Sequence, residues 1–214
     1  MSSSSALTLA EAIENRRSLH KLSDDVTVAN SRIEEIIHHA VLYSPTPFNC
    51  QSGRTVLLVK DEHKKFWDLA REVAQATAPP QLFEKVYEPR IKMFRAAYGT
   101  GGDFVFVQIL FYDDISALEG MEQKWPMLKD AFPKWLDHAN GMLQYAVWTM
   151  LAAEGLGCNL QHYNPMIDAR VSQQLNIPAT WSLKAQMVFG KPDGPPMQEK
   201  QFDPVESRAL TYGA

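Results

Sequence analysis

Two adjacent arginines and a serine, Arg16, Arg17 and Ser18, stand near the start of the chain, where a first helix is expected to end. Cations at the end of a helix complement the negative pole of its dipole, which is one interpretation of the pair. Paired guanidinium groups also hold a phosphate through bidentate hydrogen bonds, and a serine hydroxyl adds a further donor. The residue types leave both interpretations open.

Two carboxamides, Asn49 and Gln51, lie two residues apart in a polar loop that runs from Ser44 to Gly53. Each amide group offers donors and acceptors. Recognition of a flat heterocycle with alternating carbonyl and nitrogen groups, such as a flavin, requires both. Taken singly, the same residues are ordinary turn formers.

A third segment combines glycines with polar residues between Glu154 and Tyr163. Either Gly155 or Gly157 can be the glycine that ends a helix. Small residues also let the backbone approach a flat ring closely, and a backbone N–H just beyond them can donate to a ring nitrogen. Both interpretations are compatible with the segment.

The sequence contains no familiar pattern for a protein nucleophile, a metal site or a phosphate loop. GxSxG, HExxH and Walker motifs are absent, and no GxGxxG follows a predicted strand. The run Gly99–Gly102 follows a predicted helix and precedes a predicted strand, so a turn is expected, since phosphate-binding glycines open helices. No metal is expected either, because His38 and His39 lie on a polar helix face and the other histidines lack ligand spacing.

Composition points to a small-molecule partner. A formal net charge of −4 and a pI near 5.9 give no reason to expect a nucleic acid or a membrane as partner. The two cysteines, Cys50 and Cys158, form no disulfide framework, which fits a reducing compartment. With no signal peptide and no apolar run near the roughly 20 residues that span a bilayer, we expect a cytoplasmic protein, with the nucleus as an alternative location.

Capping-box patterns at Thr8–Glu11 and Ser31–Glu34 predict the starts of two early helices. The second helix carries one apolar stripe, made of Ile33, Ile36, Ile37, Ala40 and Val41. Further helices are expected over Asp61–Thr77, Gln81–Ala97, Leu136–Glu154 and Asp168–Leu175. Strands are expected over Thr55–Val59, Phe104–Tyr112, Asn159–Tyr163 and Leu183–Phe189.

The irregular order of these elements predicts a single α+β domain over residues 1–214, with residues 1–6 disordered. The run Phe104–Tyr112 is apolar almost throughout, which is typical of a strand at the centre of a sheet. The apolar surface of helix Leu136–Glu154 exceeds one stripe, which favours a place in a subunit interface. The tail, residues 190–214, has few apolar residues and is expected to extend over a partner subunit.

Taken together, the three segments resemble the nitroreductase superfamily, an FMN-dependent family with an RRS-type motif near the start and N-x-Q in a proline-containing loop. Further motifs are similar to the Frm2-like subfamily of yeast and bacterial nitroreductases, so that the resemblance runs from about Leu9 to Arg208. These motifs are Asn140–Gln144, Val147–Thr149, Glu154–Gly157, Leu160–Pro165, Ala185–Met187 and Phe189–Gly190. The resemblance implies a central, mostly antiparallel sheet flanked by helices, in a domain-entwined homodimer whose FMN sites are built from both subunits.

The resemblance also implies which residues hold the phosphate end of FMN. Arg16, Arg17 and Ser18 would contact the phosphate and the ribityl chain. Lys200 and Arg208 match basic tail positions that complete the phosphate site.

Other positions match the ring contacts of the family, namely Asn49, Gln51, Gln161 and His162, the last two through backbone groups near N5. The chain departs from the family at His20, because many members have Arg or Lys there, near the pyrimidine edge of the ring. A cation at that edge stabilises the anionic reduced flavin. Whether His20 or the following Lys21 faces the ring stays open.

The activity implied by the resemblance is an NAD(P)H oxidoreductase that reduces nitroaromatic or quinone-like acceptors by a ping-pong reaction, with NADH or NADPH as donor. Two alternatives keep the flavin: an oxidase or dehydrogenase of a biosynthetic intermediate, and a regulatory protein in lipid signalling. A flavin-free interaction module is another alternative. Cys50, next to the ring contacts, is interpreted as a small filler because no neighbouring base is evident.

Overall fold

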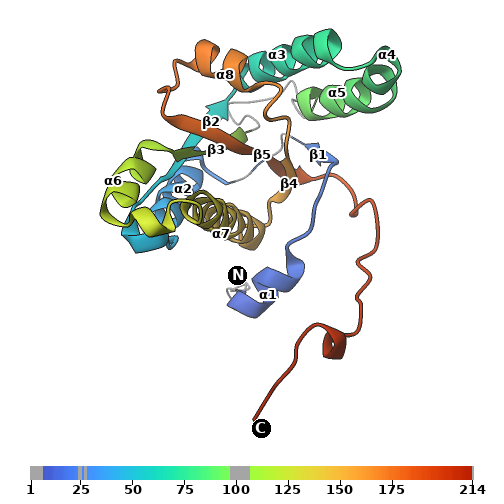
Figure 1. The fold of residues 1–214 in the computed structure, drawn as a ribbon. Helices are drawn as coiled ribbons and strands as arrows, with labels where there is room; N and C mark the ends of the chain where they lie inside the picture. The colour runs from blue at the N-terminus through green and yellow to red at the C-terminus, as the bar shows by residue number, and fades with distance from the viewer. Residues whose placement is uncertain (1–6, 24–25, 27, 97–106, 214) are drawn as a thin grey trace.

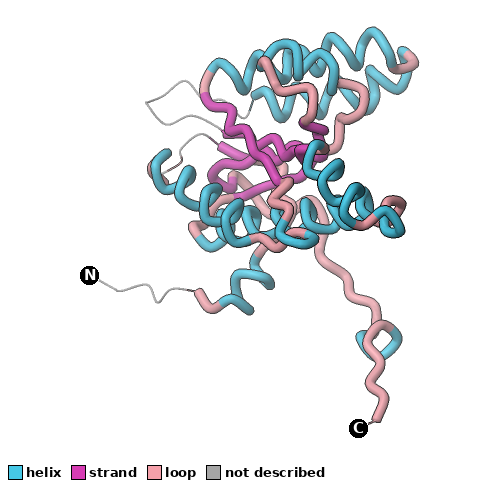
Figure 2. Tube along the Cα trace, turned by 60° about the vertical axis from the view of Figure 1, so that its left-hand side comes forward, coloured by secondary structure: helices cyan, strands magenta, loops and turns pink. Residues whose placement is uncertain are grey.

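The computed structural model describes residues 7–23, 26, 28–96 and 107–213. A sheet lies in the middle of the molecule, and helices pack against both of its faces (Figures 1 and 2). This layered arrangement agrees with the predicted α+β class. The predictions for residues 1–6, for the turn at Gly99–Gly102 and for strand residues 104–106 lie outside the described residues.

The sheet has five strands, and the long strand β5 pairs with three of the others. The strands are β1 (Leu22–Ser23), β2 (Gly53–Val59), β3 (Val107–Asp114), β4 (Gly157–Gln161) and β5 (Trp181–Pro192). Their order is β1-β5-β3-β2 with β4 also on β5, and every pair is antiparallel. Since β3 has a neighbour on each side and the run from Ile109 to Tyr112 is fully buried, the predicted central strand is confirmed.

Three helices cover one face of the sheet: α3 (Asp61–Thr77), α5 (Glu88–Ala96) and α8 (Asp168–Leu175). Phe66, Trp67 and Phe94 are buried between these helices and the sheet. The bounds of α3 and α8 are those predicted from the sequence. The predicted helix Gln81–Ala97 is instead built from α4 (Pro80–Leu82), a π-helical turn (Phe83–Tyr87) and α5.

The opposite face is covered by α2 (Asn30–Tyr43) and α7 (Phe132–Ala153). The predicted stripe of α2 faces this second core at Ile33, Ile36, Ile37 and Ala40, whereas Val41 is exposed and was wrongly included. The remaining short elements are α1 (Leu9–Asn15), α6 (Ser116–Lys124) and the 3-10 turns Pro47–Asn49, Pro126–Leu128 and Val205–Ser207.

Only the first of the two predicted capping boxes is present. At the start of α1, the Thr8 backbone N–H donates to Glu11 Oε2 at 2.7 Å, and the Glu11 N–H donates to Thr8 Oγ1 at 3.3 Å. The second prediction is wrong, because α2 begins at Asn30 with Ala29 as its cap. Ser31 therefore has helical backbone, whereas a capping side chain needs an extended one.

Glycines fix the end of α7 and the position of β4. Gly155 has φ +80° and follows the cap of α7; its N–H donates to Ala152 O, and the Leu156 N–H donates to Leu151 O. This pair of bonds is the Schellman motif, so Gly155 is the glycine that ends the helix. Gly157 has another role, since a Cβ there would lie 2.8 Å from Leu22 Cδ2.

Beyond β5 the chain runs away from the body as an extended tail that ends far from the sheet (Figures 1 and 2). Large apolar side chains of the tail, including Phe202 and Tyr212, are exposed. In the described part of the chain, every helix is too short or too polar to cross a lipid bilayer.

Candidate active site

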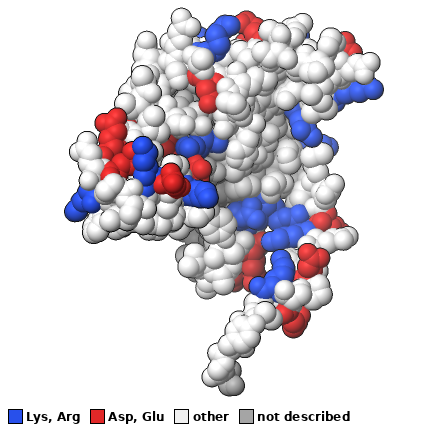
Figure 3. Space-filling view, viewed as in Figure 1, with Lys and Arg blue, Asp and Glu red and all other residues white. Residues whose placement is uncertain are grey.

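Basic side chains from three parts of the chain line one cavity of about 470 Å³. The segment after α1 contributes Arg16 and Arg17, α5 contributes Arg90, and the tail contributes Lys200. The remaining lining residues are Ser18, His20, Pro196, Met197, Gln198 and Glu199. In Figure 3, basic side chains gather where the tail leaves the body. Hereafter this space is called the basic cavity.

The segment that follows α1 is held in place by β4. Ser18 forms a parallel bridge with Cys158, and the Leu19 N–H donates to Cys158 O at 2.9 Å. Asn159 Nδ2 donates to Leu19 O at 2.9 Å. The absence of a side chain at Gly157 lets the two segments approach this closely. The motif Arg16–Ser18 is therefore fixed beside the strand that carries Gln161.

In the part of the chain that the structure describes, the cations of the basic cavity form no ion pair with a carboxylate. Arg16 lies over the ring of Trp148, 4.5 Å from its centroid, and its Nε is buried without a hydrogen bond. Arg17 Nη2 donates to Gln198 O at 2.7 Å. Within residues 7–23, 26, 28–96 and 107–213, no carboxylate forms an ion pair with these two arginines, Arg90 or Lys200. Four cations and one carboxylate, Glu199, line the basic cavity, and this excess of positive charge favours a bound anion.

A second cavity of about 350 Å³ adjoins the basic cavity and shares His20, Arg90 and Met197 with it. It adds apolar residues of α5, including Phe94, and Gln161 at the end of β4. Burial lowers the pKa of His20, and the Arg90 charge lowers this pKa further. His20 is thus neutral at pH 7, while its Nδ1 is buried without a partner.

The structure places His20, and not Lys21, in these cavities. Lys21 uses its backbone carbonyl to accept a hydrogen bond from the Asp193 N–H. His162 is exposed directly after β4 and lines neither space. Arg90 was missed in the sequence because a lone arginine in a polar helix has no distinguishing pattern; only the packing of α5 beside residues 16–20 reveals it.

The loop with the two carboxamides is conformationally strained. Phe48, Asn49 and Gln51 have φ values of 50°, 55° and 50°. Each left-handed residue with a side chain costs on the order of 1 kcal/mol. The loop is nevertheless fixed, since the Gln51 N–H donates to Thr46 Oγ1 at 3.0 Å and Arg54 Nη1 donates to Gln51 O at 2.6 Å. Strain that the surroundings maintain in this way is common in functional loops.

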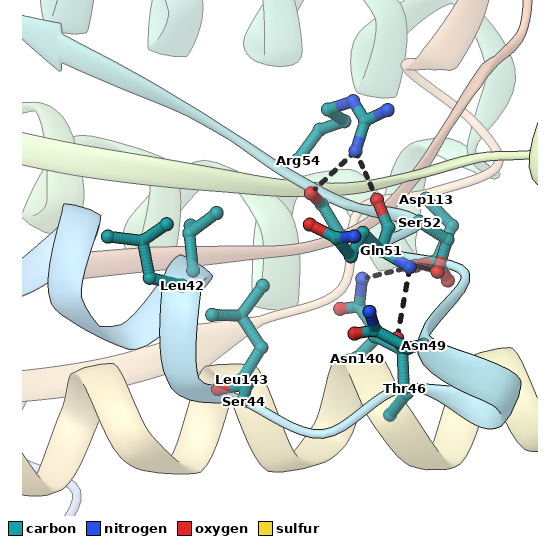
Figure 4. A pocket seen from close by; sticks show the side chains of 13 residues that line it. Leu42, Ser44, Thr46, Asn49, Gln51, Ser52, Arg54, Asp113, Asn140 and Leu143 are labelled. Carbon is teal, nitrogen blue, oxygen red and sulfur yellow. Dashed lines mark hydrogen bonds between the residues drawn. The ribbon is translucent and has the colours of Figure 1, made fainter.

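The carboxamides line a space other than the basic cavity. Asn49 and Gln51 border a narrow cavity of about 120 Å³ between α2, α7 and the start of β2 (Figure 4). Arg208 does not line the basic cavity either, and its Nη2 donates to Asp203 O within the tail at 3.1 Å. One chain therefore unites Arg16, Arg17, Ser18, His20, Gln161 and Lys200 in two adjoining cavities, and leaves out Asn49, Gln51, His162 and Arg208.

Aromatic side chains next to the loop form a further feature that the sequence analysis missed. Phe48 is 58% exposed and stacks on Trp125, with ring centroids 5.8 Å apart and planes inclined by 16°. Trp135 and the buried Phe132 contact the same ring. Cys50 is half-buried against this group, in keeping with its interpretation as a filler.

The residues of the two adjoining cavities fit a phosphate ester that carries a polar chain and a flat ring. The guanidinium groups suit the phosphate, the buried Arg16 Nε and His20 Nδ1 have no hydrogen-bond partner among the described residues, and Met93 offers partly exposed apolar surface. In the described residues no group of three or more His, Cys, Asp or Glu side chains could hold a metal ion. The arrangement suits an organic cofactor such as FMN.

The fold and the site define a nitroreductase-like protein, and comparison with known proteins agrees. The Nitroreductase family model matches residues 13–191, so the chain belongs to the nitroreductase family. Nitroreductase FRM2 of Saccharomyces cerevisiae is 33% identical over 193 residues, which cover 89% of this chain and 91% of that protein. The predicted resemblance to the superfamily and to its Frm2-like members is thereby confirmed.

Solved structures give the same result. Nitroreductase CinD from Lactococcus lactis, solved in complex with chloramphenicol, is 34% identical, with a TM-score of 0.81 over 95% of this chain and 99% of that chain. The same protein has been solved with 4-nitrophenol. A protein from Desulfovibrio desulfuricans in complex with FMN shares the fold at 19% identity, with a TM-score of 0.65 over 97% of this chain and 98% of that chain. The chain is a flavin nitroreductase-type oxidoreductase.

Proposed function

We propose that this protein is a homodimeric FMN enzyme that uses NADH or NADPH to reduce nitroaromatic or quinone-like acceptors by a ping-pong mechanism. The main support is the basic cavity, where Arg16, Arg17, Arg90 and Lys200 lie together without a carboxylate partner. An anionic cofactor would balance this charge. When bound, FMN supplies hydride transfer at N5, which the side chains of the protein cannot perform.

Each part of the site has a separate task in this proposal. Arg16, Arg17 and Lys200 hold the phosphate, and Ser18 donates to the ribityl end. Arg90 and the neutral His20, which lie between the two cavities, face the pyrimidine edge of the ring. At that edge the guanidinium of Arg90 supplies the positive charge that many relatives place at position 20.

A second copy of the chain would complete the site. The carboxamide loop is separated from the basic cavity within one chain, yet its surroundings are apolar and exposed, as expected for a surface that another subunit covers. The exposed apolar residues that line a cavity together with loop residues are Leu42, Phe48 and Met142. In the proposed dimer, Asn49 and Gln51 of one subunit meet the flavin held by the arginines of the other, and the tail extends over the partner.

The proposed acceptors are flat, electron-poor rings. CinD, at 33–34% identity, has been solved with chloramphenicol and with 4-nitrophenol. The cavity beside Gln161 combines the apolar side chains of Met93 and Phe94 with Arg90, which suits an aromatic ring that carries an oxygen-rich group. Donor and acceptor would occupy this space in turn, and this alternation gives ping-pong kinetics.

Spectroscopy tests the proposal directly. We expect the purified protein to be yellow, to contain one FMN per chain, and to lose its flavin absorbance when NADH or NADPH is added without oxygen. Addition of 4-nitrophenol or a quinone should restore the absorbance. A protein that bound FMN but kept its absorbance with both donors would contradict the reductase proposal, and a protein that bound no FMN would contradict the cofactor assignment.

A further inference from the structure

We propose that Asp113, a buried carboxylate at the end of β3, is a positioning residue that holds the carboxamide loop in the conformation needed to recognise the flavin ring. This inference depends on the proposed flavin function. It concerns a residue that lines neither cavity near Arg16 and that no motif in the sequence marks.

Asp113 and its neighbour Asp114 each form one hydrogen bond with Ser52, at the end of the loop. The Ser52 hydroxyl donates to Asp113 Oδ1 at 3.3 Å, and the Asp114 N–H donates to Ser52 O at 2.9 Å. Both Ser52 and Asp113 are fully buried. Ser52 directly follows Gln51, whose left-handed backbone must be maintained by its surroundings. The carboxylate thus fixes the residue at which the strained loop joins β2.

The same oxygen of Asp113 is tied to α7. Asn140 Nδ2 donates to Asp113 Oδ1 at 3.1 Å and to Tyr112 O at 3.0 Å, and Gln144 Nε2 donates to Asn140 Oδ1 at 2.7 Å. Figure 4 shows Asp113, Ser52 and Asn140 around Gln51, among the side chains that line the narrow cavity. The network therefore fixes the position of the loop relative to α7. This helix carries the exposed Met142 and Tyr145 and is the one proposed for the subunit interface.

A need for stability does not explain a carboxylate at this position. Burial raises the pKa of Asp113, although the hydrogen bond from Asn140 and the charge of Lys184 oppose this effect. Asp113 Oδ2 has no hydrogen-bond partner, and Lys184 Nζ lies 3.9 Å away and bonds instead to Asp137 at 2.8 Å. An apolar residue would avoid the desolvation cost of such a poorly paired buried charge. What an apolar residue cannot supply is an acceptor shared by Ser52 and Asn140.

The test separates recognition of the ring from recognition of the phosphate. Flavin-free protein is titrated with FMN and with riboflavin, which lacks the phosphate. We expect Ser52→Ala to weaken the binding of FMN and of riboflavin by the same factor, about fivefold. Asp113→Leu should weaken the binding of both flavins by about tenfold or more. Asp113→Asn, which keeps the acceptor oxygen, should stay within about twofold of the wild type. Arg17→Ala, in contrast, should weaken the binding of FMN and leave the binding of riboflavin unchanged.

Val171, a buried residue of α8, lies in the core away from the loop. Val171→Ala should lower the thermal midpoint and leave the affinities for FMN and riboflavin unchanged, so that lost stability is distinguished from lost positioning. If Ser52→Ala and Asp113→Leu bound both flavins as tightly as the wild type, or if Asp113→Asn bound as weakly as Asp113→Leu, the positioning role would be disproved. A wild-type protein that bound neither flavin would instead overturn the proposed function.

Discussion

The guanidinium of Arg16 lies 4.5 Å from the ring centroid of Trp148, so an arginine of the basic cavity packs on a side chain of helix α7. This contact joins the segment after α1 to α7, and helix α1 itself also packs against α7. A cation over an aromatic face gains on the order of 1 kcal/mol, and it is held in one orientation. Trp148 therefore fixes the orientation of the Arg16 guanidinium in the basic cavity.

The contact gives a first prediction. Trp148→Leu should weaken FMN binding by about threefold to tenfold, because Arg16 loses the surface that orients it. Trp148→Phe keeps an aromatic face and should retain most of the affinity. Fluorescence titration with FMN measures both values. Equal affinities of the leucine variant and the wild type would show that Arg16 needs no support from α7.

Arg90 gives a second prediction, about charge near the flavin ring. Arg90→Met keeps the length of the side chain and removes its charge, so the reduction potential of bound FMN should fall by tens of millivolts. The pKa of His20 should rise at the same time, because the Arg90 charge now lowers it. Potentiometric titration and NMR titration of His20 measure these two effects.

The control for Arg90 lies two residues further along α5. Lys92 is exposed and pairs with Glu88 at 2.9 Å, away from both cavities. Lys92→Met should change neither the potential nor the pKa of His20. If it changed them as much as Arg90→Met, the effect would come from the net charge of the protein and not from a position beside the ring.

A third prediction concerns His63, which is fully buried and whose Nε2 lies 3.1 Å from Phe94 O. Burial lowers its pKa from 6.5 to about 4. Between these two pH values, His63 therefore binds a proton in the unfolded chain but not in the folded chain. The contribution of His63 to the free energy of unfolding is fully present above pH 6.5. It declines as the pH falls toward 4, by on the order of 3 kcal/mol in all.

Urea unfolding at several pH values between 7.5 and 4 tests this prediction. His63→Gln keeps a donor for Phe94 O and cannot titrate, so the variant should lose less stability than the wild type across the window. The difference between the two proteins isolates His63 from other titrating groups. Parallel declines of wild type and variant would mean that His63 is protonated in the folded protein.

Much of the fold follows from local sequence patterns. The stripe of α3 and the Pro79–Pro80 break that follows it fix both ends of that helix, and the unbroken apolar run of β3 marks the centre of the sheet. The strand β1 was missed because its two residues pair only with the end of β5, and a ladder this short has no periodicity.

From residue types alone, without the family resemblance that pointed to Gln161 and Lys200, the site was predictable only where its chemistry is contiguous in the sequence. The pair Arg16–Arg17 has a charge pattern that points to phosphate without knowledge of the fold. Arg90 and Asp113 have no such pattern, since each depends on a neighbour brought from a distant part of the chain. Asp113 was hidden for a further reason: a carboxylate at the end of an apolar strand usually lies in solvent, whereas this one is buried and accepts hydrogen bonds from Ser52 and from Asn140 on α7.

The central claim is that each flavin site combines the arginines of one chain with the carboxamides of another. A mixed dimer tests it most directly: one chain carries Arg16→Ala and Arg17→Ala, the other carries Asn49→Ala and Gln51→Ala, and two different affinity tags isolate the mixed species. In a shared site, one of the two composite sites keeps all four side chains, so the mixed dimer should bind one FMN while each mutant alone binds none. If the site lay within a single chain, both sites would be damaged, and a mixed dimer without FMN would contradict the account.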